Sequence, residues 1–305
     1  MRRWILAAVT LFSCLMGGPV WTTAKIGSAL TAPDFVAGCA LPFAGIEDHH
    51  SIDHACTIAG DLTADAANQE QNRTKNNFCV TGTPASATWN TFKKLQQKTD
   101  ALTLATAGSS TPFTYGSHST LPTDRTPIRT SGFYTTTNGD DVHEGTLVHT
   151  VAFLLHGAYS GSGTGEGVNC GIHGVESADI HLALAKTKTE PDECNSFTAE
   201  ITPHFRPAEW LILSTLHKTG SKTAAVRIAA MDLDRPLRLT GQMMMDGSHR
   251  PCTPGHPQSP KRISLWEIHP VYAIDVCKKK SLSSCRVAVD TDWKALDVWL
   301  QSDEE

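Results

Sequence analysis

The sequence predicts a mainly β chain with a few helices, an α+β fold in which an OB-like small β-barrel carries a disulfide-bearing N-terminal extension. Two observations lead to this prediction. Five or six β-rich runs lie within residues 142–290 and one helical segment interrupts them, which favours a small closed or partly open barrel. The residues before this region bear cysteines and lack a comparable series of runs. A β-sandwich is the alternative fold.

Residues 1–24 form a predicted signal peptide. A basic pair at positions 2 and 3 precedes the apolar run Trp4–Phe12, and small residues follow, with possible cleavage after Ala24 or Ala29. The run is too short to span a bilayer comfortably, so we expect no transmembrane segment in the mature chain. The expected location is the periplasm or the extracellular space. A lipobox-like string ending at Cys14 makes a lipid-anchored form the alternative.

The cysteines agree with export. Eight of them follow Cys14, and an even number in an exported chain indicates disulfides. They are Cys39, Cys56, Cys79, Cys170, Cys194, Cys252, Cys277 and Cys285. The sequence does not choose among about 105 connectivities, although Cys170 and Cys194 flank one predicted strand and could pair across it. No CxxC pair occurs, so a structural zinc site of the usual spacing is not expected.

Charge and motifs exclude some classes of function. Cleavage after Ala24 removes two of the 26 basic residues and none of the 31 acidic ones, which leaves a net charge of −7. General nucleic-acid binding is therefore not expected. The glycine-rich segment 161–167 lacks the Gly-Lys-Ser/Thr ending of a phosphate loop, so we expect no nucleotide cofactor. No GxSxG elbow occurs, which disfavours a conventional serine hydrolase.

Residues 25–104 are expected to form a cysteine-containing region of helical and irregular structure. A polar segment near residue 70 is expected to begin as a helix. A second helix has a possible cap at Ser86 or Thr88 and an apolar stripe of Trp89, Phe92 and Leu95, which predicts packing against the main domain.

Residues 105–141 are rich in Thr, Ser, Gly and Pro and are interpreted as a linker. The barrel is expected over 142–290, with a helix after Pro207 that stops near Gly220. The predicted strands are Gly145–His156, Asp179–Ala185, Phe197–His204, Ala224–Ala230, Leu237–Met245 and Ser264–Val276. An amphipathic helix is expected over 291–305.

The candidate site rests on the side-chain period of two in a strand. Three predicted strands each carry a carboxylate and a histidine on one face, namely Asp179 with His181, Glu200 with His204, and Glu267 with His269. If the strands are neighbours, these groups converge on one patch. The pairs could equally be hydrogen-bonded structural pairs or decorate a solvated sheet face.

The residue types suggest roles within such a patch. Imidazole and carboxylate ligands suit a divalent metal, zinc or manganese above all, and the expected metal ligands are Asp179, His181, His204 and His269. Glu200 and Glu267 are the candidate acid/base groups, and Arg206 is the candidate clamp for an anionic group; these three are the expected catalytic residues.

Four strings together resemble a group of exported bacterial proteins to which no activity is assigned. They are QNRTKNNFC, GVNCGIHG followed by ADIHLAL, AEITPHFRPAEW, and LWEIHPVYAIDVC. The resemblance covers most of the mature chain. It implies an OB-like barrel in the C-terminal half and an exported protein, and it implies no catalytic residue.

Two functions compete. The first is an exported metal-dependent hydrolase that acts on a phosphodiester or related ester through the His/carboxylate patch. The alternative is a non-catalytic OB-like binding module of the cell envelope, with an oligosaccharide, peptide or protein ligand. A disulfide-stapled envelope protein with no small ligand is a third possibility. Neither the substrate nor the oligomeric state is specified by the sequence.

Overall fold

The computed structural model describes Ile52 and residues 55–78, 80, 82–204, 206–216 and 221–301. The predicted signal peptide and the alternative anchor at Cys14 lie outside these residues, and so do Cys39 and Cys79.

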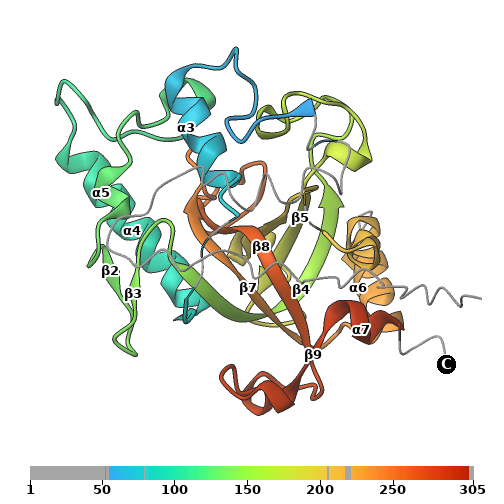
Figure 1. The fold of residues 1–305 in the computed structure, drawn as a ribbon. Helices are drawn as coiled ribbons and strands as arrows, with labels where there is room; N and C mark the ends of the chain where they lie inside the picture. Colours follow the sequence, from blue (N-terminus) through green and yellow to red (C-terminus); the bar gives the residue numbers. More distant parts are fainter. Residues whose placement is uncertain are drawn as a thin grey trace, which may run out of the picture.

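Five strands close into a barrel (Figure 1). They are β4 (Leu147–Tyr159), β5 (Ile180–Ala185), β6 (Phe197–Ile201), β7 (Pro236–Met245) and β8 (Trp266–Cys277). Neighbouring strands pair in the order β4-β5-β6-β8-β7, and β7 pairs with β4 to close the ring. The β6–β8 pairing is parallel and the other four are antiparallel. The chain is thus a mixed α/β fold built on a small β-barrel, as predicted, and not the alternative β-sandwich.

The barrel closes because β4 pairs with two strands, β7 and β5. Residues 147–153 of β4 pair with β7, and residues 153–159 pair with β5, with a register shift between Leu154 and His156. Glycine allows close approach at Gly241 of β7, where a Cβ atom would lie 2.4 Å from the carbonyl oxygen of Pro270. Close approach at a glycine lets a long strand bend, and bent strands can wrap into a ring.

Alternating side chains divide each strand between the core and the outer face. Ile180 and Leu182 of β5 are fully buried in the main core, together with Ala199 and Ile201 of β6. Because successive residues of a strand point to opposite faces, the residues between them point away from this core. This is why His181 of β5 lies on the outer face of the barrel.

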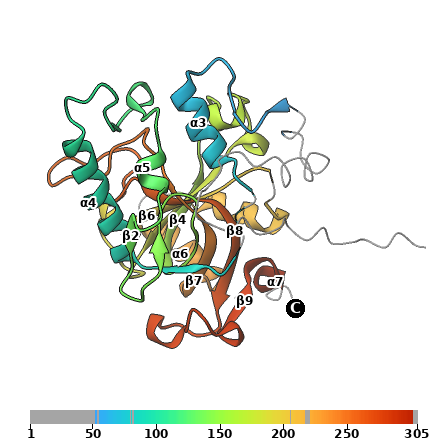
Figure 2. The same ribbon diagram turned by 60° about the vertical axis from the view of Figure 1, so that its left-hand side comes forward.

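Helix α4 (Trp89–Ala105) packs against the barrel as its apolar stripe predicted. Phe92 and Leu95 are fully buried, and the Phe92 ring stacks on Phe197 with 4.1 Å between centroids. The indole N–H of Trp266 donates to the Thr99 hydroxyl at 2.9 Å. Figure 2 shows α4 and α5 (Thr126–Arg129) beside the barrel, and β2 (Tyr134–Thr135) next to them.

The remaining elements surround the barrel and its ends. Strand β1 (Ala85–Ala87) pairs in parallel with β4, and β9 (Trp293–Ala295) pairs with β8. The others are α3 (Ala66–Lys75), η1 (His118–Thr120), β3 (Asp141–Val142), η2 (Gly167–Asn169), η3 (Val175–Ser177), η4 (Glu193–Asn195), η5 (Ala208–Thr215), α6 (Ser221–Ala230), η6 (Leu282–Ser284), η7 (Asp290–Asp292) and α7 (Leu296–Gln301). No helix among the described residues is long and apolar enough to cross a membrane.

The structure corrects several predicted elements. The segment predicted as strand Ala224–Ala230 lies within helix α6, because its alanines favour a helix and Ala224 and Ile228, four residues apart, are buried on one face. Strand β6 ends at Ile201, since Pro203 has no N–H for the ladder. The helix expected after Pro207 is a 3₁₀ segment, η5.

The segment 105–141 was predicted to be a linker, yet it contributes Arg125 and Ile128 to the protein interior. The C-terminal helix begins at Leu296, after strand β9.

Three disulfides form among the described residues, two of them between residues 114 and 58 apart and the third between residues 8 apart. The pairs are Cys56–Cys170, Cys194–Cys252 and Cys277–Cys285. The suggested pairing of Cys170 with Cys194 is therefore wrong. The bond between Cys56 and Cys170 ties the segment before α3 to the loop that leads into β5.

Candidate metal centre on the outer face of the barrel

The strands bring together most of the predicted patch. His181 of β5 is the direct cross-strand partner of Glu200 of β6. Strand β8 follows β6 in the barrel and carries Glu267 and His269, while Asp179 stands just before β5. Four of these side chains are almost completely buried, and His181 keeps 25% of its side chain exposed. The convergence expected from strand periodicity therefore occurs.

Glu200 lies at the centre of the patch, between the two imidazoles. Its Oε1 lies 3.0 Å from Nε2 of His181, and its Oε2 lies 2.6 Å from Nδ1 of His269. The same Nδ1 lies 3.5 Å from Oε1 of Glu267. One carboxylate therefore lies in close contact with both histidines, although Nε2 of His181 and Nδ1 of His269 make no hydrogen bond to any described residue.

Asp179 occupies the other side of His269. Its Oδ2 lies 3.9 Å from Nε2 of His269 and has no hydrogen-bond partner among the residues that the structure describes. Its Oδ1 accepts a hydrogen bond from Nδ2 of Asn169 at 3.1 Å. Glu166 accepts a hydrogen bond from the backbone N–H of Asp179 at 3.0 Å and places Oε1 3.8 Å from Nε2 of His181. The loop before β5 thus adds two carboxylates to the patch.

Two groups of side chains have the geometry of metal ligands within the described part of the chain. In each, the ligand atoms all lie within 4.8 Å of one another. The first group is Glu166, Asp179 and His181, and the second is Asp179, Glu200 and His269. A buried carboxylate oxygen without a hydrogen bond is costly unless a cation or donor satisfies it. Both groups share Asp179, and its unpartnered Oδ2 therefore fits a cation.

Basic residues that the sequence reasoning missed surround this patch. Nζ of Lys75, at the end of α3, lies 3.4 Å from Oε2 of Glu200 and 4.0 Å from Oε1 of Glu267. Arg262 donates from Nη1 to Oε2 of Glu267 at 2.8 Å and from Nη2 to Oδ2 of Asp246 at 3.0 Å. Lys75 comes from the N-terminal region and Arg262 from the β7–β8 loop. No local sequence pattern therefore predicts their contacts with the patch.

The pKa values follow from burial and charge. Burial would lower the pKa of each imidazole, but the neighbouring Glu200 carboxylate outweighs it and raises the pKa to about 9 for His181 and about 10 for His269. Burial and the Asp179 charge raise the pKa of Glu166 to about 7. Burial opposes ionisation of Glu200, yet the nearby cationic groups hold its pKa well below the usual range.

His204 and Arg206 lie elsewhere than expected. His204 follows the end of β6, is fully buried beside Phe78, with 5.1 Å between ring centroids, and belongs to neither ligand group. Arg206 donates to the backbone oxygens of Ala178 and Val175 at 2.6 and 2.7 Å. It therefore holds the loop that carries Asp179, and the predicted role of anion clamp stays a prediction.

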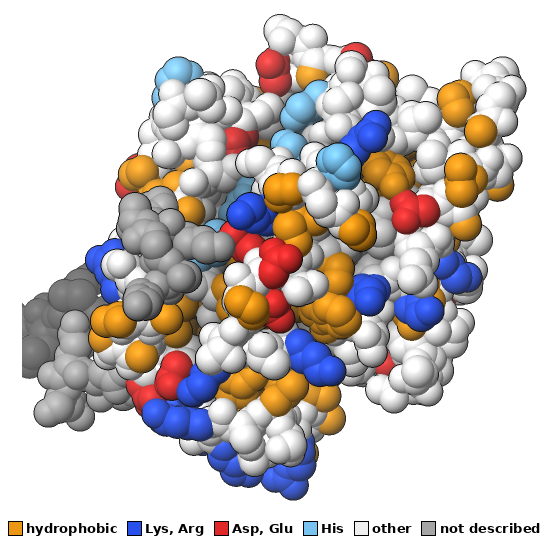
Figure 3. Space-filling view, turned by 180° about the vertical axis from the view of Figure 1, so that it is seen from behind, with side chains coloured by type: hydrophobic (Ala, Val, Ile, Leu, Met, Phe, Trp, Pro, Cys, Tyr) orange, Lys and Arg blue, Asp and Glu red, His pale blue; other side chains and the backbone are white. Residues whose placement is uncertain are grey.

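A groove of about 340 Å³ borders the patch at His181. Its floor includes Ala183 and Thr198, small residues that pair across β5 and β6. His156 and Glu193, whose side chains contact each other, also line the groove. The small side chains leave room for a ligand to extend along the outer face of the sheet. Figure 3, a view of the molecule from behind, shows acidic side chains near the middle of the visible surface, with histidines above them.

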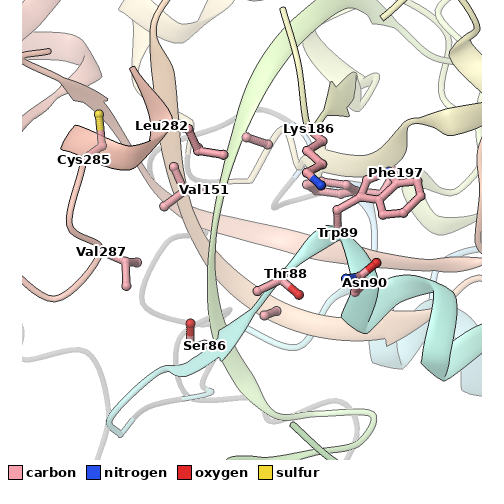
Figure 4. A pocket seen from close by; sticks show the side chains of 12 residues that line it. Ser86, Thr88, Trp89, Asn90, Val151, Lys186, Phe197, Leu282, Cys285 and Val287 are labelled. Atoms are coloured by element: carbon pink, nitrogen blue, oxygen red, sulfur yellow. The ribbon is translucent and has the colours of Figure 1, made fainter. Parts of the chain in front are cut away.

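A separate cavity of about 350 Å³ lies near the start of α4 (Figure 4). Trp89, Phe197 and Lys186 stand on one side of it, and the 282–287 loop stands on the other. None of the His/carboxylate patch lines this cavity.

Comparison with known proteins gives no match: no protein family, no curated protein and no solved structure is significantly similar to this chain. The functional argument therefore rests on the geometry of the patch.

Proposed function

We propose that this chain is an exported hydrolase in which the outer-face patch holds a divalent metal ion, zinc or manganese, for the cleavage of a phosphodiester or related ester. The observation that carries the proposal is Oδ2 of Asp179, buried and without a hydrogen bond among the described residues, facing the imidazole of His269. Mixed carboxylate and imidazole ligands suit these metals. A bound ion would supply an activated water at neutral pH and polarise the scissile group.

The surrounding residues support this chemistry by positioning the ligands. Glu200 lies between both imidazoles, and Asn169 holds Asp179 through Oδ1 so that Oδ2 points toward His269. Glu267, predicted as an acid/base group, is paired with Arg262, which suits it to holding His269 in place.

The strand order supports an OB-like barrel. An OB-fold is a five-stranded Greek-key barrel that binds ligands on the face of its second and third strands. In this chain those strands are β5 and β6, which carry His181 and Glu200, and helix α6 stands between the third and fourth barrel strands. The groove beside His181 lies on the same face. The three disulfides agree with an exported protein.

The test compares two Asp→Asn variants. Asp179→Asn keeps the shape of the ligand but removes its charge, whereas Asp290→Asn changes a surface side chain that is 91% exposed. Protein purified without chelator is measured for metal by elemental analysis, and for hydrolysis of bis(p-nitrophenyl) phosphate and p-nitrophenyl acetate. We expect bound metal and hydrolysis in the wild type and in Asp290→Asn, and neither in Asp179→Asn. Equal metal content in all three proteins would contradict the proposal.

The groove favours one alternative, the non-catalytic binding module, because its small-residue floor could hold an oligosaccharide or an extended peptide without chemistry. Ligand binding that persists in Asp179→Asn, with no hydrolysis in the wild type, would favour this alternative.

A further inference from the structure

The two histidines of the patch lie on opposite sides of one carboxylate. Glu200 places one oxygen 3.0 Å from His181 and the other 2.6 Å from His269. A carboxylate that spans two imidazoles in this way leaves each of them with a different set of neighbours. Glu166 is the additional neighbour of His181, at 3.8 Å. Asp179 and Glu267 are the additional neighbours of His269, at 3.9 and 3.5 Å.

Asp179 connects the part of the patch around His181 to the part around His269. It belongs to both ligand groups, with Glu166 and His181 on one side and with Glu200 and His269 on the other. Its side chain is about 1% exposed, and Oδ2 has no hydrogen-bond partner within the described residues. A carboxylate shared by two ligand groups is the usual bridge between ions about 3.5–4 Å apart in two-metal hydrolytic sites. The donors of the two groups, two imidazoles and three carboxylates, are the ligand types of carboxylate-bridged dinuclear centres.

The net charge of the site distinguishes a site with one bound ion from a site with two. The carboxylates in and around it are Glu166, Asp179, Glu200, Asp246 and Glu267. The basic side chains facing them are Lys75, Arg206 and Arg262. Because an imidazole must lose its proton to bind a metal, His181 and His269 count as neutral in the metal-loaded site, and five ionised carboxylates against three basic groups then leave a charge of −2 before the ions are added. One divalent ion neutralises this charge, and only a second makes the site positive and attractive to a monoanionic substrate.

The groove beside His181 agrees with an anionic substrate. Lys261 lines the groove, and its ammonium group forms no ion pair with any described residue. His156 and Glu193, whose side chains contact each other, also line it. A phosphate that flanks the scissile group could therefore lie near Lys261.

We infer that the patch holds two divalent ions bridged by Asp179 and that its substrates are phosphodiesters. This inference rests on the proposed function. In the reaction, the oxygen of a water forms a bond to phosphorus while the bond from phosphorus to the leaving oxygen breaks with its electron pair. One proton of the water ends on the leaving alcohol, and the other remains with the phosphate monoester. The two ions clamp the attacking and leaving oxygens.

The experiment counts ions in the full-length protein. Metal-free protein is titrated with Mn²⁺, bound metal is measured by elemental analysis, and the electron paramagnetic resonance spectrum is recorded for the signature of a coupled manganese pair. The variants are His181→Gln and His269→Gln. The matched control is His149→Gln, in the part of β4 that pairs with β7.

We expect about two equivalents and a coupled spectrum in the wild type and in His149→Gln, and about one equivalent with an uncoupled spectrum in each of the other variants. Hydrolysis of bis(p-nitrophenyl) phosphate should develop with the second equivalent, whereas hydrolysis of neutral p-nitrophenyl acetate should develop with the first. If His269→Gln fails to fold, His181→Gln decides the question, because its side chain is 25% exposed.

The outcomes separate this inference from the proposed function. A single equivalent in the wild type, with hydrolysis of either ester, would overturn the two-ion inference and leave a one-ion hydrolase. No bound manganese and no hydrolysis would overturn both. Two equivalents with hydrolysis of the acetate ester alone would overturn the assignment of phosphodiesters as substrates.

Discussion

The carboxylate of Glu144 is fully buried and joins three segments of the chain. It accepts hydrogen bonds from Nε of Arg125 at 2.8 Å, from Nε of Arg129 at 2.9 Å and from the backbone N–H of Met245 at 3.1 Å, and Nη2 of Arg125 makes a further short contact. The side chains of Glu144 and Arg125 are both 0% exposed. Glu144→Gln would keep the shape of this residue but leave the Arg125 guanidinium buried without its counter-charge.

The expected cost follows from that uncompensated charge. Removing one partner of a buried ion pair typically costs about 3–5 kcal/mol in the free energy of unfolding. The matched control is Asp290→Asn, which breaks a pair with Arg238 in which Asp290 is 91% exposed. Exposed pairs contribute about 0–1 kcal/mol. Urea denaturation at pH 7 measures both variants against the wild type.

The pH dependence gives a second readout. Burial would raise the pKa of Glu144, but the Arg125 and Arg129 charges and hydrogen bonds outweigh it and lower the pKa below its ordinary value of 4.5. The stabilising contribution is therefore present above pH 4.5 and is lost as the pH falls through the folded pKa. The wild type should lose stability on acidification more steeply than Glu144→Gln. A Glu144→Gln variant within 1 kcal/mol of the wild type at pH 7, with the same acid dependence, would refute this reasoning.

Two further predictions concern the barrel and its N-terminal cover. Gly241→Ala should destabilise the protein by about 1–3 kcal/mol or more, because the new Cβ would lie 2.4 Å from the carbonyl oxygen of Pro270. Gly163→Ala, where nothing lies within 4 Å, should be close to neutral, and equal urea midpoints for the two variants would contradict the close packing. The Cys56–Cys170 bond joins residues 114 apart. Replacing both cysteines by serine should lower the free energy of unfolding by about 2–5 kcal/mol, which thermal unfolding measures. An unchanged melting temperature would contradict the predicted contribution of this disulfide.

Strand periodicity was enough to predict the centre of the candidate site. His181, Glu200, Glu267 and His269 share the outer face because alternation is local and the strands that carry them are neighbours. The same rule failed for His204, because Pro203 ends the ladder and the chain turns away before the next outward position.

Contacts between distant segments could not be predicted in the same way. Lys75 reaches Glu200 from a helix 125 residues earlier in the chain. Glu166 lies in the glycine-rich segment 161–167, to which the sequence assigned no site residue, but the Cys56–Cys170 bond nearby and its own contact with Asp179 hold it against the patch. Helix α6 was predicted as a strand, since its short apolar run also fits a period of two.

The most direct test of the central claim is anomalous diffraction from crystals soaked in zinc or manganese, recorded on both sides of the metal's absorption edge. The account predicts a strong anomalous peak within about 2.0–2.2 Å of ligand atoms of Asp179 and His269, and a second such peak on the side of His181. No peak in the patch, or a peak only at another histidine such as His118 or His249, would contradict it.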